Sequence, residues 1–309
     1  MVRTEIPETI IQEAGKKIGN TPVHRVSNKL FNNPRVQIYA KKEWLQTGGS
    51  VKARAAFNII RTALETGELN ENKVLLDATS GNTGIAYAAV ARELGIKVTL
   101  CLPENASKER KQILTDLGVH IIYTSPLEGT DGSQEVALKL AKEHPEKYFY
   151  ADQYKNDNNW KAHYNTTAFE ILEQVPGITH FASGLGTTGT FVGTGRRLRE
   201  LKPSVKLISF QPESAMHGME GWKHLETAIV PTIYDATVAD ENISIPTEEA
   251  YDMLVKVYEV EGLLLSPSSA ANITGAIKVA ESIKEGIIVT ILPDNADKYS
   301  EVINKLIRK

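Results

Sequence analysis

Short apolar runs alternate with helical patterns along almost the whole chain, and this alternation limits the fold more than any other feature. Runs rich in Val, Ile and Leu predict buried strands, whereas apolar residues three and four positions apart predict the helices between them. Strands separated by helices join into a parallel sheet whose faces the helices cover. We therefore expect an α/β protein with largely parallel, twisted sheets, and ligands where strands end and helices begin.

The predicted strands are Val36–Ala40, Lys73–Ala78, Lys97–Leu102, Val119–Thr124, Tyr148–Ala151, Ile178–Ala182, Val205–Gln211 and Ile287–Leu292. The predicted helices are Val51–Glu65, Gly84–Leu94, Ser107–Leu117, Gln134–Lys142, Asn159–Gln174, Gly189–Leu201, Thr247–Val260, Ser269–Ile283 and Asp297–Ile307. The stretch from Glu213 to Ile245 lacks periodicity, and we expect a substrate or interface loop there.

Charge and cysteine content exclude several classes of protein. The chain has 309 residues and a net charge of -3, without a basic stripe, so we expect no nucleic-acid partner. Cys101 is the one cysteine and lies in an apolar run, which excludes an internal disulfide and indicates a buried thiol. No run approaches the length of about 18 apolar residues that a membrane span needs, and no signal peptide is evident. We expect a soluble, cytoplasmic protein that binds neither a membrane nor a metal.

Lys52 follows the glycine-serine turn Gly48-Gly49-Ser50 and opens a predicted helix, with Ser50 as its N-cap. The positive end of the helix dipole and small, uncharged neighbours disfavour the ammonium form of the lysine. A neutral lysine is a nucleophile that forms Schiff bases with carbonyl compounds, pyridoxal phosphate among them. The alternative is a solvated lysine in the first turn of an amphipathic helix.

A second polar turn, Thr79-Ser80-Gly81-Asn82-Thr83-Gly84, joins a predicted strand to a helix rich in alanine. Hydroxyls, an amide and backbone N–H groups at a helix N-terminus suit a carboxylate or another anion. Polar glycine turns are also ordinary connections, and Asn82 alone fits a cap as well as a ligand.

The turn Gly184-Leu185-Gly186-Thr187-Thr188-Gly189-Thr190 has the spacing G-x-G-x-x-G, which also occurs in dinucleotide sites. Three threonines can donate to a terminal phosphate, whereas a bridging pyrophosphate favours bare backbone. We therefore predict a phosphomonoester site, with NAD binding and a purely structural turn as alternatives. A third turn, Leu265 to Ala271, contains three serines, one of which we expect to cap the following helix.

Together the motifs Gly48–Lys52, Thr79–Gly84, Gly186–Thr190 and Ser268 resemble the cysteine synthase family, pyridoxal-phosphate (PLP) dependent enzymes of fold type II. The likeness extends from Ile18-Gly19-Asn20-Thr21-Pro22 to Pro293-Asp294 and includes Asp152-Gln153-Tyr154. Two departures stand out. Ala53 replaces the aspartate that usually follows the Schiff-base lysine, and Thr188 replaces a common glycine, which makes the turn more similar to the type B and O-phosphoserine-using branch.

The resemblance implies two domains with PLP in the cleft between them, as in the tryptophan synthase β subunit. Residues 45–156 would form the smaller, mobile substrate domain, residues 13–44 with 157–309 the larger one, and residues 1–12 an N-terminal arm. It also implies a homodimer.

The resemblance further implies roles for individual residues. Lys52 would hold the cofactor as a Schiff base and act as the general base, Asn82 would bind the phenolic oxygen, and Ser268 would face the pyridine nitrogen. The phosphate would be held by Gly186, Thr187, Thr188, Gly189 and Thr190, and the substrate carboxylate by Thr79, Ser80, Gly81, Thr83 and Gln153. Lys223 falls where phosphoserine-using relatives place an arginine for the substrate phosphate, although an exposed lysine in a flexible loop is the alternative.

The implied reaction is a β-replacement on O-acetyl-L-serine or O-phospho-L-serine through an α-aminoacrylate, giving L-cysteine. Free sulfide and a thiocarboxylated carrier protein are both possible sulfur donors. Other reactions on this scaffold stay open, namely those of a cystathionine β-synthase, a diaminopropionate synthase or a serine/threonine dehydratase. An NAD-dependent oxidoreductase and a catalytically idle paralogue are the alternatives from other classes.

Overall fold

The computed structural model describes residues 6–79 and 81–307, which form two compact units. The first unit contains the described part of Met1–Gly19 together with Gln46–Asn159. The second contains Asn20–Leu45 and the described part of Trp160–Lys309. Each unit has its own sheet and its own hydrophobic core.

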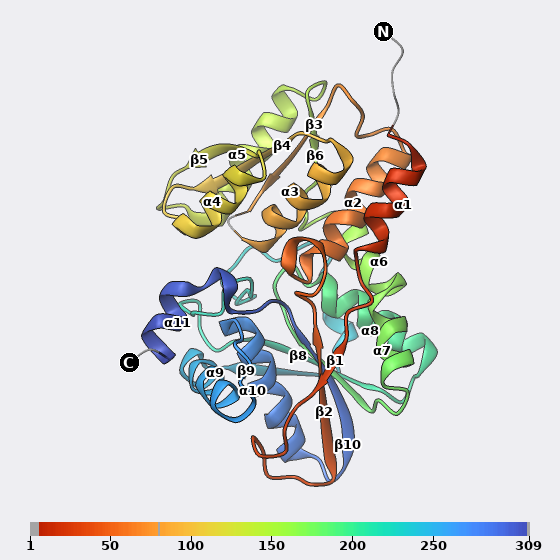
Figure 1. Cartoon of the computed structure of the whole chain (residues 1–309), viewed down its shortest axis with the longest axis vertical. Coiled ribbons are helices and arrows are strands. Elements are labelled where there is room, and N and C mark those ends of the chain that lie inside the picture. Colours follow the sequence, from red (N-terminus) through yellow and green to blue (C-terminus); the bar gives the residue numbers. More distant parts are fainter. Residues whose placement is uncertain (1–5, 80, 308–309) are drawn as a thin grey trace. The chain divides into compact units, whose positions relative to one another are not determined.

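The first unit is built on a parallel sheet with the strand order β5-β4-β3-β6. Its strands are β3 (Val74–Ala78), β4 (Val98–Pro103), β5 (His120–Thr124) and β6 (Tyr148–Tyr150), and its helices are α1 (Glu8–Lys16), α2 (Lys52–Glu65), α3 (Asn82–Leu94), α4 (Lys108–Asp116) and α5 (Gly129–Glu143). Alternate residues of β3 face opposite sides, so Leu75 packs with α2 and α3 whereas Leu76 packs with α5. Figure 1 shows these helices around the sheet.

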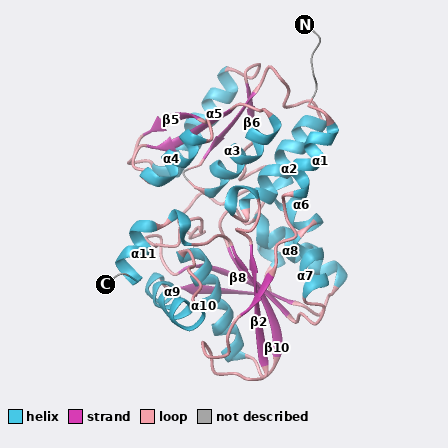
Figure 2. Cartoon of the chain, viewed as in Figure 1, coloured by secondary structure: helices cyan, strands magenta, loops and turns pink. Residues whose placement is uncertain are grey.

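The second unit has a six-stranded sheet in the order β1-β2-β10-β7-β8-β9, parallel except for the edge strand β1. Its strands are β1 (Val23–Arg25), β2 (Val36–Lys42), β7 (His180–Gly184), β8 (Lys206–Pro212), β9 (Glu241–Ile245) and β10 (Gly286–Leu292). The remaining helices are α6 (Asn158–Asn165), α7 (Thr167–Gln174), α8 (Gly189–Leu201), α9 (Thr247–Glu261), α10 (Pro267–Ser282) and α11 (Ser300–Ile307), coloured cyan against magenta strands in Figure 2.

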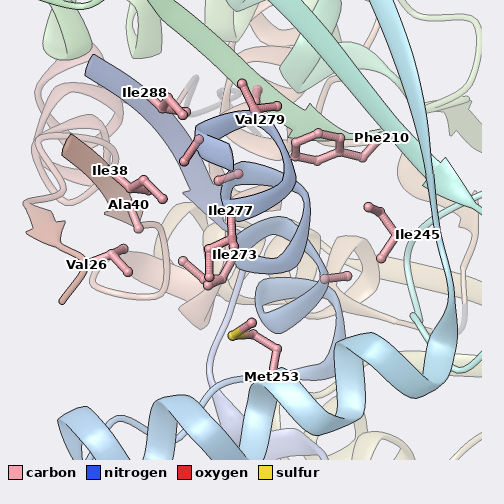
Figure 3. Packing of buried hydrophobic residues seen from close by; sticks show 14 of the residues in the cluster. Val26, Ile38, Ala40, Phe210, Ile245, Met253, Ile273, Ile277, Val279 and Ile288 are labelled. Carbon is pink, nitrogen blue, oxygen red and sulfur yellow. The ribbon is translucent and has the colours of Figure 1, made fainter. Parts of the chain in front are cut away.

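Helix α10 forms the centre of the second core. Its Ile273 and Ile277 lie in one cluster with Ile38, Phe210 and other sheet residues, and α9 contributes Met253 (Figure 3). A helix that is buried on nearly all sides needs small residues, which explains the alanine and serine content of its sequence. The packing fixes the first turn of α10 in place, and that turn carries Ser268.

The expected α/β class with two largely parallel sheets is confirmed, and most expected elements agree within a few residues. Gly95 has a φ of +69° and ends α3, as the sequence predicts. The domain limits expected from the resemblance stay a prediction, although α1 begins at Glu8, inside the expected N-terminal arm.

Two details of the expectation were wrong. The segment Asn159–Gln174 forms two helices, because Thr166 has a φ of -130° and interrupts the helical geometry. The stretch expected to be a loop to Ile245 ends in the strand β9. Val51 directly precedes α2, while Ser50 before it has an extended backbone and accepts the N–H of Lys52 with its hydroxyl at 3.4 Å, so the expected capping bond of Ser50 is present. Among the described helices, none is both long and apolar enough to cross a membrane.

Candidate active site

Lys52 is the first residue of α2 and is half-buried. The turn before it, Thr47–Gly49, has left-handed glycines, with φ +77° at Gly48 and +61° at Gly49. A Cβ atom at Gly48 would lie 3.1 Å from the Cα of Ala86, so the turn packs tightly against α3. Gly48 therefore meets a backbone requirement and a packing requirement at the same position. It fixes the point at which α2 begins with Lys52.

The Thr79 turn and Gln153 lie together in the first unit. They follow β3 and β6, which are parallel neighbours, so their polar groups emerge at one edge of the sheet. Thr83 donates its hydroxyl to Oε1 of Gln153 at 2.7 Å, and the Gln153 side chain donates to the Ala78 carbonyl at 3.3 Å. The expected residues Thr79, Thr83 and Gln153 are all buried, whereas Ser80 lies outside the described residues.

Asn82 opens α3 after Gly81, which is its N-cap and has no atom within 4 Å of an added Cβ. An open backbone at a helix N-terminus is a suitable approach for an anion. The Asn82 Oδ1 atom is fully buried.

Asp77 is a buried carboxyl group that the sequence reasoning missed. Its Oδ1 accepts the N–H of Ala78 at 2.7 Å and its Oδ2 accepts the N–H of Gln153 at 3.4 Å. Burial raises the pKa of Asp77 to about 7. The sequence did contain a signal, namely an acidic residue inside the apolar strand Val74–Ala78. A carboxyl group is rarely fully buried unless it is paired with another polar group. Asp77 holds the backbone of Gln153 in position.

The threonine turn of the second unit lies at the N-terminus of α8, with Thr188 as the N-cap. Thr188 has a φ of +72°, a conformation that β-branched residues rarely adopt. Its side chain is buried, and its hydroxyl has no hydrogen-bond partner within the part of the chain that is described. An orphaned buried hydroxyl at a helix N-terminus fits an anion with several acceptor oxygens, such as a phosphate.

His163 supports this turn from α6. One ring nitrogen lies 2.9 Å from the hydroxyl of Thr167 and the other 3.2 Å from the hydroxyl of Thr190. His163 is buried, so the two threonines hold its ring in place. The contact in turn restricts the rotamer of the Thr190 hydroxyl.

A loop packs directly on the threonine turn and includes Lys223. A Cβ atom at Gly186 would lie 1.9 Å from the carbonyl oxygen of Gly221, and one at Gly184 would lie 2.0 Å from Trp222. The N–H of Lys223 donates to the Leu185 carbonyl at 2.8 Å. The backbone of Lys223 is therefore attached to the turn, which makes a fully flexible loop an inadequate description.

Ser268 lies in the first turn of α10 and is buried. Ser266 caps this helix by accepting the N–H of Ser269, so the expected serine cap is confirmed. Asn272 of the same helix accepts the N–H of Gly184 at 2.8 Å and so links α10 to the end of β7.

The structure thus groups the expected residues into two sets. Lys52, Thr79, Asn82, Thr83 and Gln153 belong to the first unit, and Gly186 to Thr190, Lys223 and Ser268 belong to the second. Cys101 is buried, and burial raises the pKa of its thiol to about 11, as expected for a core residue. Among the described residues, no cluster of His, Cys, Asp and Glu side chains could hold a metal ion.

Comparison with known proteins gives one consistent result. The sequence model of a family described as pyridoxal-phosphate dependent enzyme matches residues 15–294. A cysteine synthase of Aquifex aeolicus is 44% identical over 94% of this chain and 90% of its own length. An O-acetylserine dependent cystathionine beta-synthase of Bacillus subtilis is 37% identical over 94% and 96%. The solved structure of an O-acetylserine dependent cystathionine beta-synthase from Helicobacter pylori is 34% identical, covers 93% of this chain and 96% of its own, and has a TM-score of 0.87.

Proposed function

Because the chain belongs to the cysteine synthase family of pyridoxal-phosphate dependent enzymes, we propose that it makes L-cysteine from an activated L-serine and sulfide. The family also assigns the fold to type II and the cofactor to pyridoxal phosphate. The substrate is O-acetyl-L-serine or O-phospho-L-serine. The β-substituent leaves with its bonding electrons, and the sulfur forms the new bond at the β-carbon.

The observation that carries the proposal is the neutral hydroxyl of Ser268 in the first turn of α10. Bound pyridoxal phosphate supplies an electron sink for the α-carbon of an amino acid. A serine beside its ring nitrogen adds no negative charge, unlike an aspartate, so it does not hold that nitrogen protonated. The weaker sink favours prompt loss of a β-substituent over a long-lived carbanion.

The expected site residues have three different roles in the proposed reaction. The amine of Lys52 would hold the cofactor, and the same amine would remove the proton from the α-carbon of the substrate and later return it. The Thr188 and Thr190 hydroxyls and the glycine N–H groups bind the phosphate, which matches the orphaned hydroxyl at the start of α8. Thr79, Ser80, Thr83 and Gln153 bind the substrate carboxylate, and Asn82 binds the phenolic oxygen.

Lys223 is proposed to bind the phosphate of O-phospho-L-serine. Its backbone attachment to Leu185 supports a position beside the threonine turn. A lysine acts there as a point charge without the bidentate geometry of arginine, so we expect soft discrimination and use of both substrates.

Steady-state kinetics with both substrates test this specificity. Lys223→Ala is expected to raise the KM for O-phosphoserine about tenfold, as expected for one charge-assisted contact, and to change the KM for O-acetylserine little. Lys223→Arg serves as the matched variant and is expected to lower the KM for O-phosphoserine. Equal losses for both substrates, or none for either, would remove Lys223 from the site and leave O-acetylserine as the substrate.

A second candidate function is the O-acetylserine dependent cystathionine beta-synthase reaction, in which a thiol amino acid replaces sulfide. Two similar proteins carry that name, at 37% and 34% identity. Product analysis with sulfide and homocysteine in competition separates the two functions. We also propose a homodimer in the cytoplasm, and sedimentation should give twice the chain mass of 34.0 kDa.

A further inference from the structure

The first turn of α10 contains three buried serine hydroxyls in one hydrogen-bonded group. Ser266, Ser268 and Ser269 are each at most 3% exposed. The hydroxyl oxygens of Ser266 and Ser268 lie 3.2 Å apart, and the carbonyl oxygen of Asp294 lies beside the group. Each hydroxyl has a single proton to donate, so a bond that one hydroxyl donates limits what its neighbours can donate.

Ser269 is fully engaged within the protein. Its hydroxyl donates to the Asp294 carbonyl at 2.6 Å and accepts the N–H of Asp294 at 3.4 Å. Its proton is therefore not available to a ligand. Ser268 differs, because the hydrogen bond of its hydroxyl within the described chain is the one with Ser266, whose donor the geometry leaves open.

Ser266 has one proton and two acceptors. Its oxygen already accepts the N–H of Ser269 at 3.2 Å, and its proton can go to the Asp294 carbonyl at 3.3 Å or to Ser268 at 3.2 Å. If Ser266 donates to Ser268, the Ser268 proton is released for another acceptor. If Ser268 donates to Ser266, it can only accept from a ligand.

We propose that Ser266 is a positioning residue that donates to Ser268 and so makes Ser268 a donor to the ring nitrogen of the cofactor. This inference rests on the proposed function. A chain of two hydroxyls polarises both bonds in the same direction, which strengthens the bond at the nitrogen. It also favours an unprotonated nitrogen, since a protonated one needs an acceptor at Ser268. Ser266 thereby helps to set the electronic state on which β-replacement depends.

The matched variants separate this role from helix capping. Ser266→Gly removes the hydroxyl, while glycine is itself well tolerated at an N-cap. Ser266→Thr keeps both the cap and the donor. Ser268→Ala removes the proposed contact itself, and Ser269→Ala removes a neighbouring buried hydroxyl that has no part in the relay.

The direct readout is the nitrogen resonance of ¹⁵N-labelled pyridoxal phosphate bound to each variant, together with its dissociation constant. Ser266→Gly is expected to move the resonance toward that of Ser268→Ala and to raise the dissociation constant about threefold to tenfold. Ser266→Thr and Ser269→Ala are expected to keep the wild-type resonance.

A wild-type resonance in Ser266→Gly would overturn the relay and leave the proposed function intact. An identical resonance in wild type and Ser268→Ala would show that Ser268 does not contact the nitrogen, which overturns the relay as well. A wild-type protein that takes up no pyridoxal phosphate would contradict the proposed function, and the relay with it.

Discussion

At the scale of the residue, Thr188 shows how a binding group can cost stability. Its left-handed backbone is unfavourable for a β-branched side chain by about 1–2 kcal/mol, and its buried hydroxyl is orphaned within the described chain. A glycine at this position would avoid both costs. A hydrogen bond from the Thr188 hydroxyl to a bound phosphate would offset this cost in free energy.

We predict opposite effects of Thr188→Gly on stability and on cofactor binding. Relief of the backbone strain should stabilise the apoprotein, and the greater entropy of glycine in the unfolded chain should offset part of this gain. The urea midpoint of the apoprotein should therefore rise slightly. The dissociation constant of pyridoxal phosphate should rise about tenfold through the loss of one charge-assisted bond. Thr188→Asn, which tolerates this backbone region and keeps a polar group, is the control. Unchanged cofactor affinity in Thr188→Gly would exclude Thr188 as a phosphate ligand.

Asp77 gives a prediction for pH dependence. Burial raises its pKa to about 7 in the folded protein, so between pH 4 and pH 7 the folded state binds a proton that the unfolded state has lost. The carboxyl group therefore favours folding below pH 4, and this contribution is lost as the pH rises through 7. From pH 5 to pH 8 the loss should be about 2.6 kcal/mol, since nearly two pH units at about 1.36 kcal/mol each separate pH 5 from the folded pKa.

Urea unfolding of wild type and Asp77→Asn at pH 5 and pH 8 measures this loss. The midpoint should fall with pH more in the wild type than in the variant, whose amide does not titrate. Parallel pH dependence in the two proteins would show that Asp77 does not titrate in this range.

At the scale of the element, the sequence predicted strands and helices well where the pattern was long and both ends carried a signal. Helix α8 agrees at both ends, and Gly95 terminates α3 as expected. Short edge strands were missed, since β1 has only three residues and β9 begins with two exposed polar residues, which leaves Ile243 and Ile245 as its one apolar alternation. The break at Thr166 was also missed, because no glycine or proline marks it in the sequence from Asn159 to Gln174.

The residues of the candidate site also fall into those that the local sequence predicts and those that it does not. Motifs at strand ends were found because polar groups interrupt apolar runs. Asp77 and His163 act through tertiary contacts, at Gln153 and Thr190 respectively, and no local spacing encodes these contacts. The capping role of Ser50 could be predicted, because its hydroxyl accepts an N–H only two residues further along the chain.

The turn before α2 yields a prediction with an internal control. Gly48→Ala should destabilise the protein by about 2 kcal/mol, because φ is +77° and the Ala86 backbone lies 3.1 Å from the new Cβ. Gly67 has nearly the same φ, +76°, but no atom within 4 Å, so Gly67→Ala should cost only about 1 kcal/mol. Urea unfolding measures both. Equal losses would show that the turn does not depend on its packing against α3.

At the scale of the whole molecule, two parallel-sheet units each carry half of the expected constellation. The first contains the lysine and the residues proposed for the substrate carboxylate, and the second contains the residues proposed for the cofactor phosphate and ring nitrogen. Each unit has its own hydrophobic core beneath these turns. The alternation of strands and helices predicts both sheets, whereas the residue contacts within each unit required the structure.

The central claim is that Lys52 carries pyridoxal phosphate, and borohydride reduction followed by peptide mass mapping tests it most directly. Reduction converts the Schiff base into a stable secondary amine, so the pyridoxyl group stays on the lysine that formed it. We predict a yellow protein whose reduced peptide map has the pyridoxyl mass on Lys52, and a Lys52→Ala variant that folds but has no turnover. A pyridoxyl group on another lysine, or a protein that binds no pyridoxal phosphate, would contradict the account.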